Sequence, residues 1–213
     1  MQLNTRSTVA GLSLQFAGFV LQKPPPDERY QQVLVFSAEQ GHLRCFQRLS
    51  SRQSAVALDL FDEVEAMATS SNQGRTWFFS EVRVRRRFAG IGLSFAALSE
   101  ASAFVTLLAR NPTHEDSRAA AYALLGTALQ AWSEGAHPEI VTLKVLYSFA
   151  RAEGYPVKED WAAGLRGSDS ENARRFLNEP LAALAGSDPD SVARLLENLR
   201  RYLKGHTDIV MGP

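Results

Sequence analysis

The spacing of apolar residues changes once along this chain, near residue 92. Before that point apolar and polar residues alternate with a period of two, as in residues 12–16, which is typical of half-buried strands. After it, apolar residues recur three and four positions apart, as in residues 192–203, which is typical of amphipathic helices. The sequence therefore predicts an α+β protein, with strands in residues 1–92 and an all-helical domain in residues 93–213.

Five segments of the first domain have the composition and the flanking turns of strands. They are residues 12–21, 32–37, 43–49, 57–68 and 76–87. The fourth segment is also compatible with a helix, because it is rich in Ala and Glu. Gly18 interrupts the alternation of the first segment, which predicts a bulge or a sharp coil. Five short strands separated by turns favour a small closed β-barrel over a sandwich.

Prolines and glycines divide the second domain into helices. Helices are predicted from residue 95 to the Asn111-Pro112 pair and over residues 117–134, 138–153 and 188–205. A further helix is expected to start at Ser170, and Pro180 is expected to kink or split it. Residues 157–170 are predicted to form a loop that contains Trp161.

The overall charge is balanced, with 23 basic and 23 acidic residues, but it is unevenly distributed. Residues 1–92 carry a net charge of +3 and residues 93–213 a net charge of −3, so any affinity for nucleic acid is expected in the first domain. The single cysteine, Cys45, excludes an internal disulfide and a thiolate zinc cage. No stretch approaches the ~20 apolar residues of a membrane span, and residues 9–21 lack the features of a signal peptide. We therefore expect a cytoplasmic protein with no membrane contact.

The sequence contains no recognisable catalytic constellation. None of the four histidines has the i, i+4 spacing of a zinc-binding helix, and no phosphate-binding loop is present. Gly90 and Gly92 follow a run of arginines and lack a third glycine, so we interpret them as a hinge. Paired acids such as Asp62 and Glu63 are interpreted as solvated faces. We expect no enzymatic activity, no cofactor and no metal.

Two groups of arginines give the first domain its positive charge. They are Arg44, Arg48 and Arg52, in the acid-free residues 41–58, and Arg83, Arg85, Arg86 and Arg87, at the end of the fifth strand. An outward row of arginines suits a phosphate backbone, and a guanidinium group also stacks on bases. These seven residues are therefore the candidate DNA-binding residues.

Alternation along the fifth strand predicts which of its side chains face water. The predicted outer face carries Trp77, Phe79, Glu81, Arg83, Arg85 and Arg87, and the predicted inner face carries Phe78, Val82 and Val84. Three alternatives stay open: the arginines form a solvated edge, they pair with the acids of residues 59–65, or the outer aromatic residues pack beneath the helical domain.

The order of these segments resembles the RecO family of bacterial recombinational-repair mediators over nearly the whole chain. The matching stretches are AGFVLQ at residues 17–22, VLVFSAEQGHLR at 33–44, the arginine-containing loop at 48–54, KVLYSFARAEGYP at 144–156, and the closing helix and tail at 194–212. The resemblance implies an N-terminal OB-fold, a five-stranded β-barrel, followed by an all-α helical domain. It also implies a DNA-binding role in DNA repair and DNA recombination after DNA damage.

The resemblance implies binding to single-stranded and double-stranded DNA, strand annealing, and loading of recombinase onto DNA coated by single-stranded-DNA-binding protein, together with the partner RecR. By position it assigns DNA contacts to Arg44, Arg48 and Arg52. This chain departs from the family in two respects: its loop carries fewer basic residues, and it lacks the four zinc cysteines of some members. Trp161 stands near the first of those positions, so we expect apolar packing in place of the metal.

A groove between the second and last helices is expected to hold the acidic C-terminal tail of single-stranded-DNA-binding protein. The residues suggested for this contact are Arg118, Arg200, Arg201 and Lys204. The alternative function is a non-enzymatic protein-interaction scaffold with a RecO-like fold and weak DNA binding, whose acidic helical domain supplies the docking surfaces.

Overall fold

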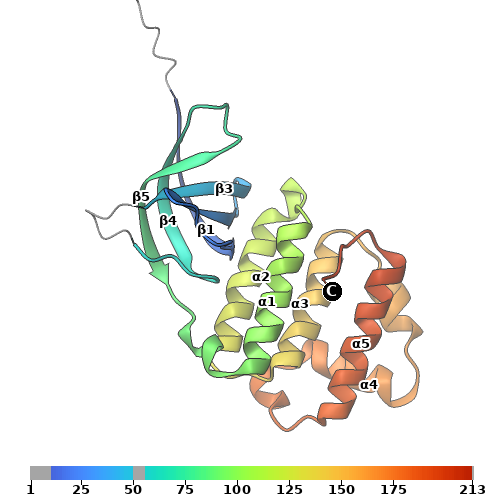
Figure 1. Cartoon of the computed structure of the whole chain (residues 1–213). Helices are drawn as coiled ribbons and strands as arrows, with labels where there is room; N and C mark the ends of the chain where they lie inside the picture. Colours follow the sequence, from blue (N-terminus) through green and yellow to red (C-terminus); the bar gives the residue numbers. More distant parts are fainter. Residues whose placement is uncertain (1–10, 50–55, 213) are drawn as a thin grey trace, which may run out of the picture. The chain divides into compact units, whose positions relative to one another are not determined.

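The computed structural model describes residues 11–49 and 56–212 (Figure 1). The chain divides into two compact units, and the division falls between Arg86 and Arg87. It had been expected at residue 92, so the segment with the two hinge glycines belongs to the helical unit. There Ala89–Leu93 forms a short 3-10 helix.

The first unit is a closed barrel of five strands in the order β1-β2-β3-β5-β4. The strands are β1 (Leu12–Gln22), β2 (Tyr30–Ser37), β3 (Gly41–Arg48), β4 (Glu63–Ser70) and β5 (Trp77–Arg86). In this order β3 and β5 pair in parallel, and the other neighbouring strands pair antiparallel. The predicted small barrel is therefore confirmed, and its strand count is that of an OB-like fold.

β1 closes the barrel because it pairs with two neighbours along its length. Residues Leu12 to Phe19 pair with β4, and Phe19 to Gln22 pair with β2. At Gly18 a Cβ atom would lie 2.3 Å from Val35 Cγ1, so only glycine permits the close approach of the two strands. The register shift in β1 falls between Val20 and Gln22, just after the glycine.

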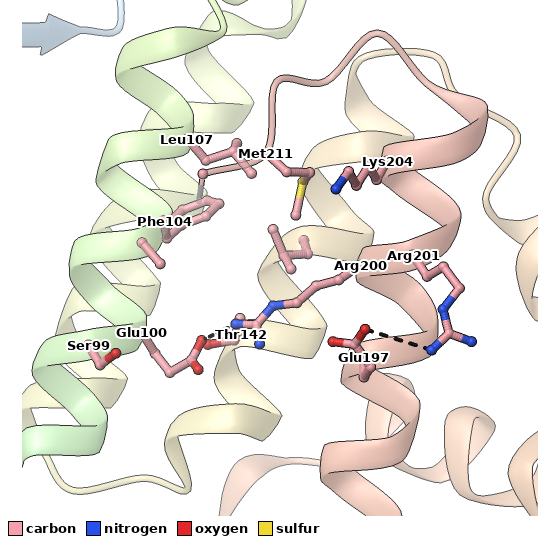
Figure 2. Close-up of a pocket in the computed structure, with 13 residues that line it drawn as sticks. Ser99, Glu100, Phe104, Leu107, Thr142, Glu197, Arg200, Arg201, Lys204 and Met211 are labelled. Atoms are coloured by element: carbon pink, nitrogen blue, oxygen red, sulfur yellow. Dashed lines mark hydrogen bonds and ion pairs between the residues drawn. The ribbon is translucent and has the colours of Figure 1, made fainter.

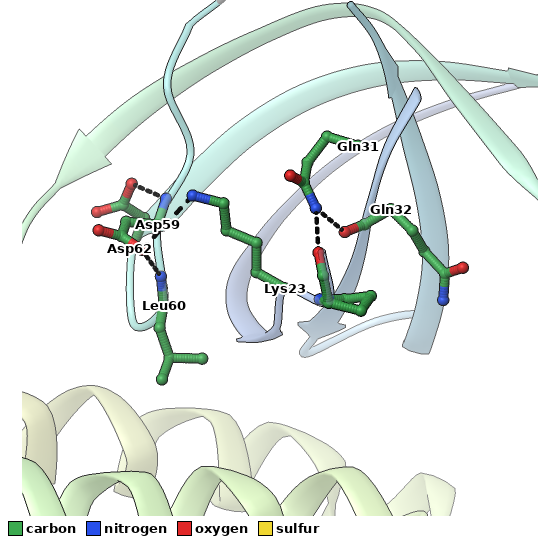
Figure 3. A network of polar contacts seen from close by, with 7 residues as sticks. Lys23, Gln31, Gln32, Asp59, Leu60 and Asp62 are labelled. Atoms are coloured by element: carbon green, nitrogen blue, oxygen red, sulfur yellow. Dashed lines mark hydrogen bonds and ion pairs between the residues drawn. The ribbon is translucent and has the colours of Figure 1, made fainter. Parts of the chain in front are cut away.

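The fourth strand begins at Glu63, so the prediction that it starts at residue 57 was wrong. The preceding residues form a turn in which Phe61 has a φ of 72°. Figure 3 shows why: the Asp59 backbone N–H donates to Asp62 Oδ2 at 2.9 Å, and the Leu60 N–H donates to Asp59 Oδ1 at 2.9 Å. These local carboxylate contacts satisfy backbone groups that a strand would otherwise place in its ladder.

The barrel core consists of buried apolar side chains from all five strands and from the turn before β4. They are Phe16, Val20, Val33, Val35, Leu43, Cys45, Leu58, Val64, Ala66, Ala68 and Trp77. Burial raises the pKa of the Cys45 thiol to about 12, so this cysteine is a packing residue in its protonated form.

The second unit is helical, as predicted. Its helices are α1 (Phe95–Arg110), α2 (Glu115–Ser133), α3 (Pro138–Ala152), α4 (Gly167–Asn178) and α5 (Pro189–His206). The expected loop at 157–170 instead contains a π-helical turn, Lys158–Ala162, and the first turn of α4. Pro180 separates α4 from a short 3-10 helix, Leu181–Leu184, and α5 continues through Gly205.

α3 is the central helix of this unit, because it packs against α1, α2, α4 and α5. Its Phe149 ring lies 6.3 Å from that of Phe104 on α1, which in turn lies 6.2 Å from Trp132 on α2. The Trp132 indole N–H donates to the Pro138 carbonyl at 3.1 Å, so the buried ring leaves no polar atom unpaired. Among the described residues, 11–49 and 56–212, no helix combines the length and the hydropathy that a membrane span requires.

Candidate nucleic-acid interface

The two faces of β5 differ from the predicted alternation in its first half. Trp77 is only 8% exposed and belongs to the barrel core, whereas Phe78 is 37% exposed. Phe79 is also packed against the core, so the prediction that Trp77 and Phe79 face outward and Phe78 inward was wrong. In the second half, Val82 and Val84 do pack against the core, as predicted.

A β-bulge explains the change of face. Met67 and Ala68 are consecutive on β4, but their partners on β5 are Glu81 and Phe79, so Ser80 is an extra residue. The Ser80 hydroxyl donates to the Met67 carbonyl at 3.0 Å and so stabilises the bulge. One extra residue inverts the alternation on either side of it, and this is why Phe78 and Arg83 both face water.

The exposed Phe78 belongs to a group of three rings that we call the aromatic patch: Tyr30 on β2, Phe46 on β3 and Phe78 on β5. The Phe46 and Phe78 rings are stacked, with centroids 5.5 Å apart, and these residues are partners in the parallel pairing of β3 with β5. The Tyr30 ring packs edge-on against both rings, with its centroid 5.6 Å from that of Phe78 and 6.3 Å from that of Phe46. Tyr30 and Phe46 are half-buried, so the patch presents partly exposed ring surface to solvent.

Two of the predicted arginines lie beside the aromatic patch. Arg44 and Arg48 are two residues before and after Phe46, so all three side chains share the outer face of β3. Arg48 is also the cross-strand partner of Tyr30. Both arginines are exposed, and neither side chain forms an ion pair or hydrogen bond with another residue of the described part of the chain. Their charge is therefore available to a ligand.

Arg52, the third arginine of this group, lies outside the described residues. The sequence analysis predicted outward aromatic residues only on the fifth strand, so it did not identify the aromatic patch. One signal was present: Arg44, Phe46 and Arg48 alternate through a strand, which places a ring between two guanidinium groups on one face.

The β5 arginines are partly neutralised by β4. The Arg83 Nε lies 3.0 Å from Glu65 Oε2, and Arg86 donates twice to Glu63 Oε2, at 2.9 and 3.0 Å. The hydrogen bond from Arg83 lowers the pKa of the Glu65 carboxyl. The alternative in which the β5 arginines pair with acids of residues 59–65 is thus confirmed for two of them.

The remaining β5 candidates have different surroundings. Arg85 is exposed and acts on Glu65 through its charge, which also lowers the pKa of that carboxyl. Arg87 is exposed and begins the helical unit. Among the described residues, Arg44 and Arg48 on β3 form no ion pair, whereas Arg83 and Arg86 on β5 each pair with a glutamate of β4.

A groove of about 600 Å³ lies in the helical unit between α1, α3 and α5 (Figure 2). Arg200, Arg201 and Lys204 line it, but Arg118 and the rest of α2 do not. The sequence analysis had expected a groove between the second and last helices, whereas this groove is bounded by α1, α3 and α5. Arg200 is paired with Glu100 at 2.7 Å and Arg201 with Glu197 at 3.8 Å.

The C-terminal segment forms one wall of this groove through Met211 and Gly212. It is held by Asn111, whose side chain accepts from the Val210 N–H at 2.8 Å and donates to the Val210 carbonyl at 3.1 Å. Ile209 is buried, which anchors the segment further. The groove therefore combines apolar residues with a rim of mixed charge.

Trp161 occupies a packed position in the π-helical turn. It is 4% exposed, its indole N–H donates to Asn198 Oδ1 at 2.7 Å, and its ring lies 6.0 Å from Tyr147. Within the described residues no three His, Cys, Asp or Glu side chains are grouped so that they could hold a metal ion.

Comparison with known proteins assigns no family to this chain. No protein-family model matches the sequence, and a search of curated proteins finds no match.

Proposed function

We propose that this chain is a DNA repair and recombination mediator that binds single-stranded and double-stranded DNA through the outer face of its barrel. The observation that carries the proposal is the aromatic patch, flanked on β3 by the exposed Arg44 and Arg48. The proposal also agrees with the resemblance to the RecO family, in which the barrel is the DNA-binding domain.

The chemistry of the patch favours single strands. An unpaired base stacks on an exposed ring with a gain of about 1–3 kcal/mol, and this gain requires no particular base. The guanidinium groups on either side of Phe46 are placed to contact phosphates or to stack on neighbouring bases. In duplex DNA the base faces are covered, so binding there depends on phosphate contacts and is weaker.

The proposed mediator anneals strands and helps to load recombinase onto DNA coated by single-stranded-DNA-binding protein, with RecR as a partner. The groove of the helical unit is the proposed contact for the acidic tail of single-stranded-DNA-binding protein. The exposed Lys204 on the rim of the groove suits the carboxylates of such a tail.

A salt titration of oligonucleotide binding tests the proposal. The full chain is expected to bind a fluorescent oligo-dT at about 50 mM salt, with affinity that falls linearly on a logarithmic salt scale. If no binding to single-stranded DNA is seen under these conditions, the proposed function is wrong.

A scaffold function is the second candidate, and one observation favours it. Leu93, the last residue of the 3-10 helix, and Phe95, the first residue of α1, are 90% and 88% exposed. Exposed apolar groups of this size are typical of protein contacts. Stable capture of a partner protein, together with undetectable affinity for DNA, would favour the scaffold over the mediator.

A further inference from the structure

A basic pocket of about 430 Å³ lies between α3, the π-helical turn Lys158–Ala162 and α4 of the helical unit. α3 and α4 pack against each other, and both can be followed in Figure 1. Four cationic side chains line the pocket: Lys144, Arg151, Lys158 and Arg174. None of the described residues that line it is an Asp or a Glu. This pocket is separate from the groove between α1, α3 and α5.

Three of these cationic side chains form no ion pair within the part of the chain that the structure describes. Arg151, Lys158 and Arg174 are exposed, and none of their side chains forms an ion pair or hydrogen bond with another residue that the structure describes. Other arginines of the same unit are paired: Arg175 lies 3.3 Å from Glu179, and Arg194 lies 2.8 Å from Asp169. Like charges gathered in one concave site attract an anion from solution.

Lys144 forms the inner wall of the pocket. Its ammonium group donates to the carbonyl of Leu177 at 3.1 Å and to that of Glu179 at 2.9 Å, which ties α3 to the end of α4. An ammonium group has three donors, so one remains for a ligand. Burial lowers the pKa of Lys144, and the charge of Glu179 opposes this shift. An anion in the pocket would stabilise the charged form further.

Hydroxyl groups complete the lining. Tyr147 and Ser148 on α3 and Ser170 in the first turn of α4 all line the same cavity. Hydroxyls and cationic donors together match the oxygens of a phosphate group, which accept several hydrogen bonds and carry negative charge. A carboxylate ligand would use fewer of these donors.

We propose that this pocket is a phosphate-binding site. The phosphate belongs either to a DNA backbone or to a free phosphorylated small molecule, since both present the same oxygens. In the first case the helical unit adds a second DNA contact to that of the barrel, and this form of the inference rests on the proposed function. Binding of inorganic phosphate does not rest on it.

The test is a titration of the isotopically labelled full chain with inorganic phosphate, followed by amide NMR shifts. Sodium chloride at equal ionic strength is the control for screening. Phosphate is expected to shift amides around Ser148, Arg151 and Arg174 in a saturable manner, whereas chloride is not. Shifts that are absent, or that chloride reproduces, would overturn the inference.

Substitutions assign the binding to the side chains. Arg151→Gln, Lys158→Gln and Arg174→Gln are each expected to weaken phosphate binding by about three- to tenfold, as loss of a charge-assisted contact does, and the triple variant is expected to abolish it. Arg110→Gln is the matched control, because Arg110 is exposed and lies outside the pocket. The residues are at the surface, so an unchanged thermal midpoint checks that the variants fold. Binding unaffected by the triple variant would refute the site.

An oligonucleotide arm identifies the source of the phosphate. If oligo-dT shifts the same pocket amides and competes with phosphate, the site contacts DNA. If phosphate binds but the oligonucleotide leaves the pocket unchanged, the site takes a small phosphorylated ligand. Amides near Phe46 report separately on the barrel, so failure of DNA binding there is distinguishable from failure of the pocket.

Discussion

Phe78→Ala is the most direct perturbation of the aromatic patch. Phe78 is 37% exposed, and its ring centroid lies 5.5 Å from that of Phe46 and 5.6 Å from that of Tyr30. If one base stacks on this ring, its loss costs about 1–3 kcal/mol of binding free energy. That energy corresponds to a decrease of about 5- to 150-fold in affinity for single-stranded DNA. The assay is fluorescence anisotropy of a labelled oligo-dT at constant salt.

The same substitution has a modest effect on stability. Each aromatic pair contributes about 0.5–1.5 kcal/mol beyond its buried area, and in a chain of this size 1 kcal/mol lowers the thermal midpoint by about 2–4 °C. The protein therefore stays folded at the temperature of the assay. The dependence of affinity on salt is expected to be unchanged, because no phosphate contact is removed.

Met67→Ala is the control for this experiment. Met67 lies on β4 outside the aromatic patch and is 42% exposed, similar to Phe78. Its loss removes comparable exposed apolar surface but no ring, so DNA affinity is expected to stay within twofold, as a roughly neutral surface change would give. Equal effects of the two substitutions on affinity would refute base stacking at the patch.

Three further predictions follow from the barrel. The double substitution Arg44→Gln and Arg48→Gln is expected to reduce the slope of the logarithm of single-strand affinity against the logarithm of salt concentration by about 1.4, since each phosphate contact contributes about 0.7. An unchanged slope in the anisotropy assay would contradict phosphate contact by these residues. Gly18→Ala is expected to lower the free energy of unfolding, measured with urea, by about 1–3 kcal/mol, because the new Cβ would lie 2.3 Å from Val35 Cγ1. An unchanged free energy of unfolding would show that β1 and β2 can move apart at this position. Burial raises the pKa of the Cys45 thiol to about 12, so this thiol is expected to be protonated at pH 8 and to react with iodoacetamide only after unfolding. Mass spectrometry measures the extent of alkylation, and rapid alkylation of the folded chain would contradict the burial of Cys45.

The resemblance of the sequence to the RecO family and the geometry of the barrel support the proposed function independently. The resemblance placed DNA contacts at Arg44 and Arg48 by position, and the structure shows both side chains exposed beside stacked rings. The geometry of the site does not depend on the resemblance, so the substitutions above test the site by itself.

The architecture could be predicted from the amino-acid sequence, because the spacing of apolar residues is a local property of the chain. The change from a period of two to a period of three to four separated the barrel from the helices, and the five strands were found from turns and alternation. The alternation of Arg44, Phe46 and Arg48 was also readable. The start of β4 could not be predicted, because the apolar residues of 57–62 are compatible with a turn as well as with a strand. Local hydrogen bonds to carboxylate groups stabilise the turn.

The side chains that form the candidate interface could not be predicted in the same way, because they depend on how the strands pair. The bulge at Ser80, which turns Phe78 outward and Trp77 inward, depends on the register of β5 against β4. Register also brings Glu65 to Arg83 and Glu63 to Arg86 and so neutralises arginines that the sequence had favoured. These pairs join residues far apart along the chain, and pairing across strands is set by the closed barrel as a whole, which alternation within a single strand does not encode.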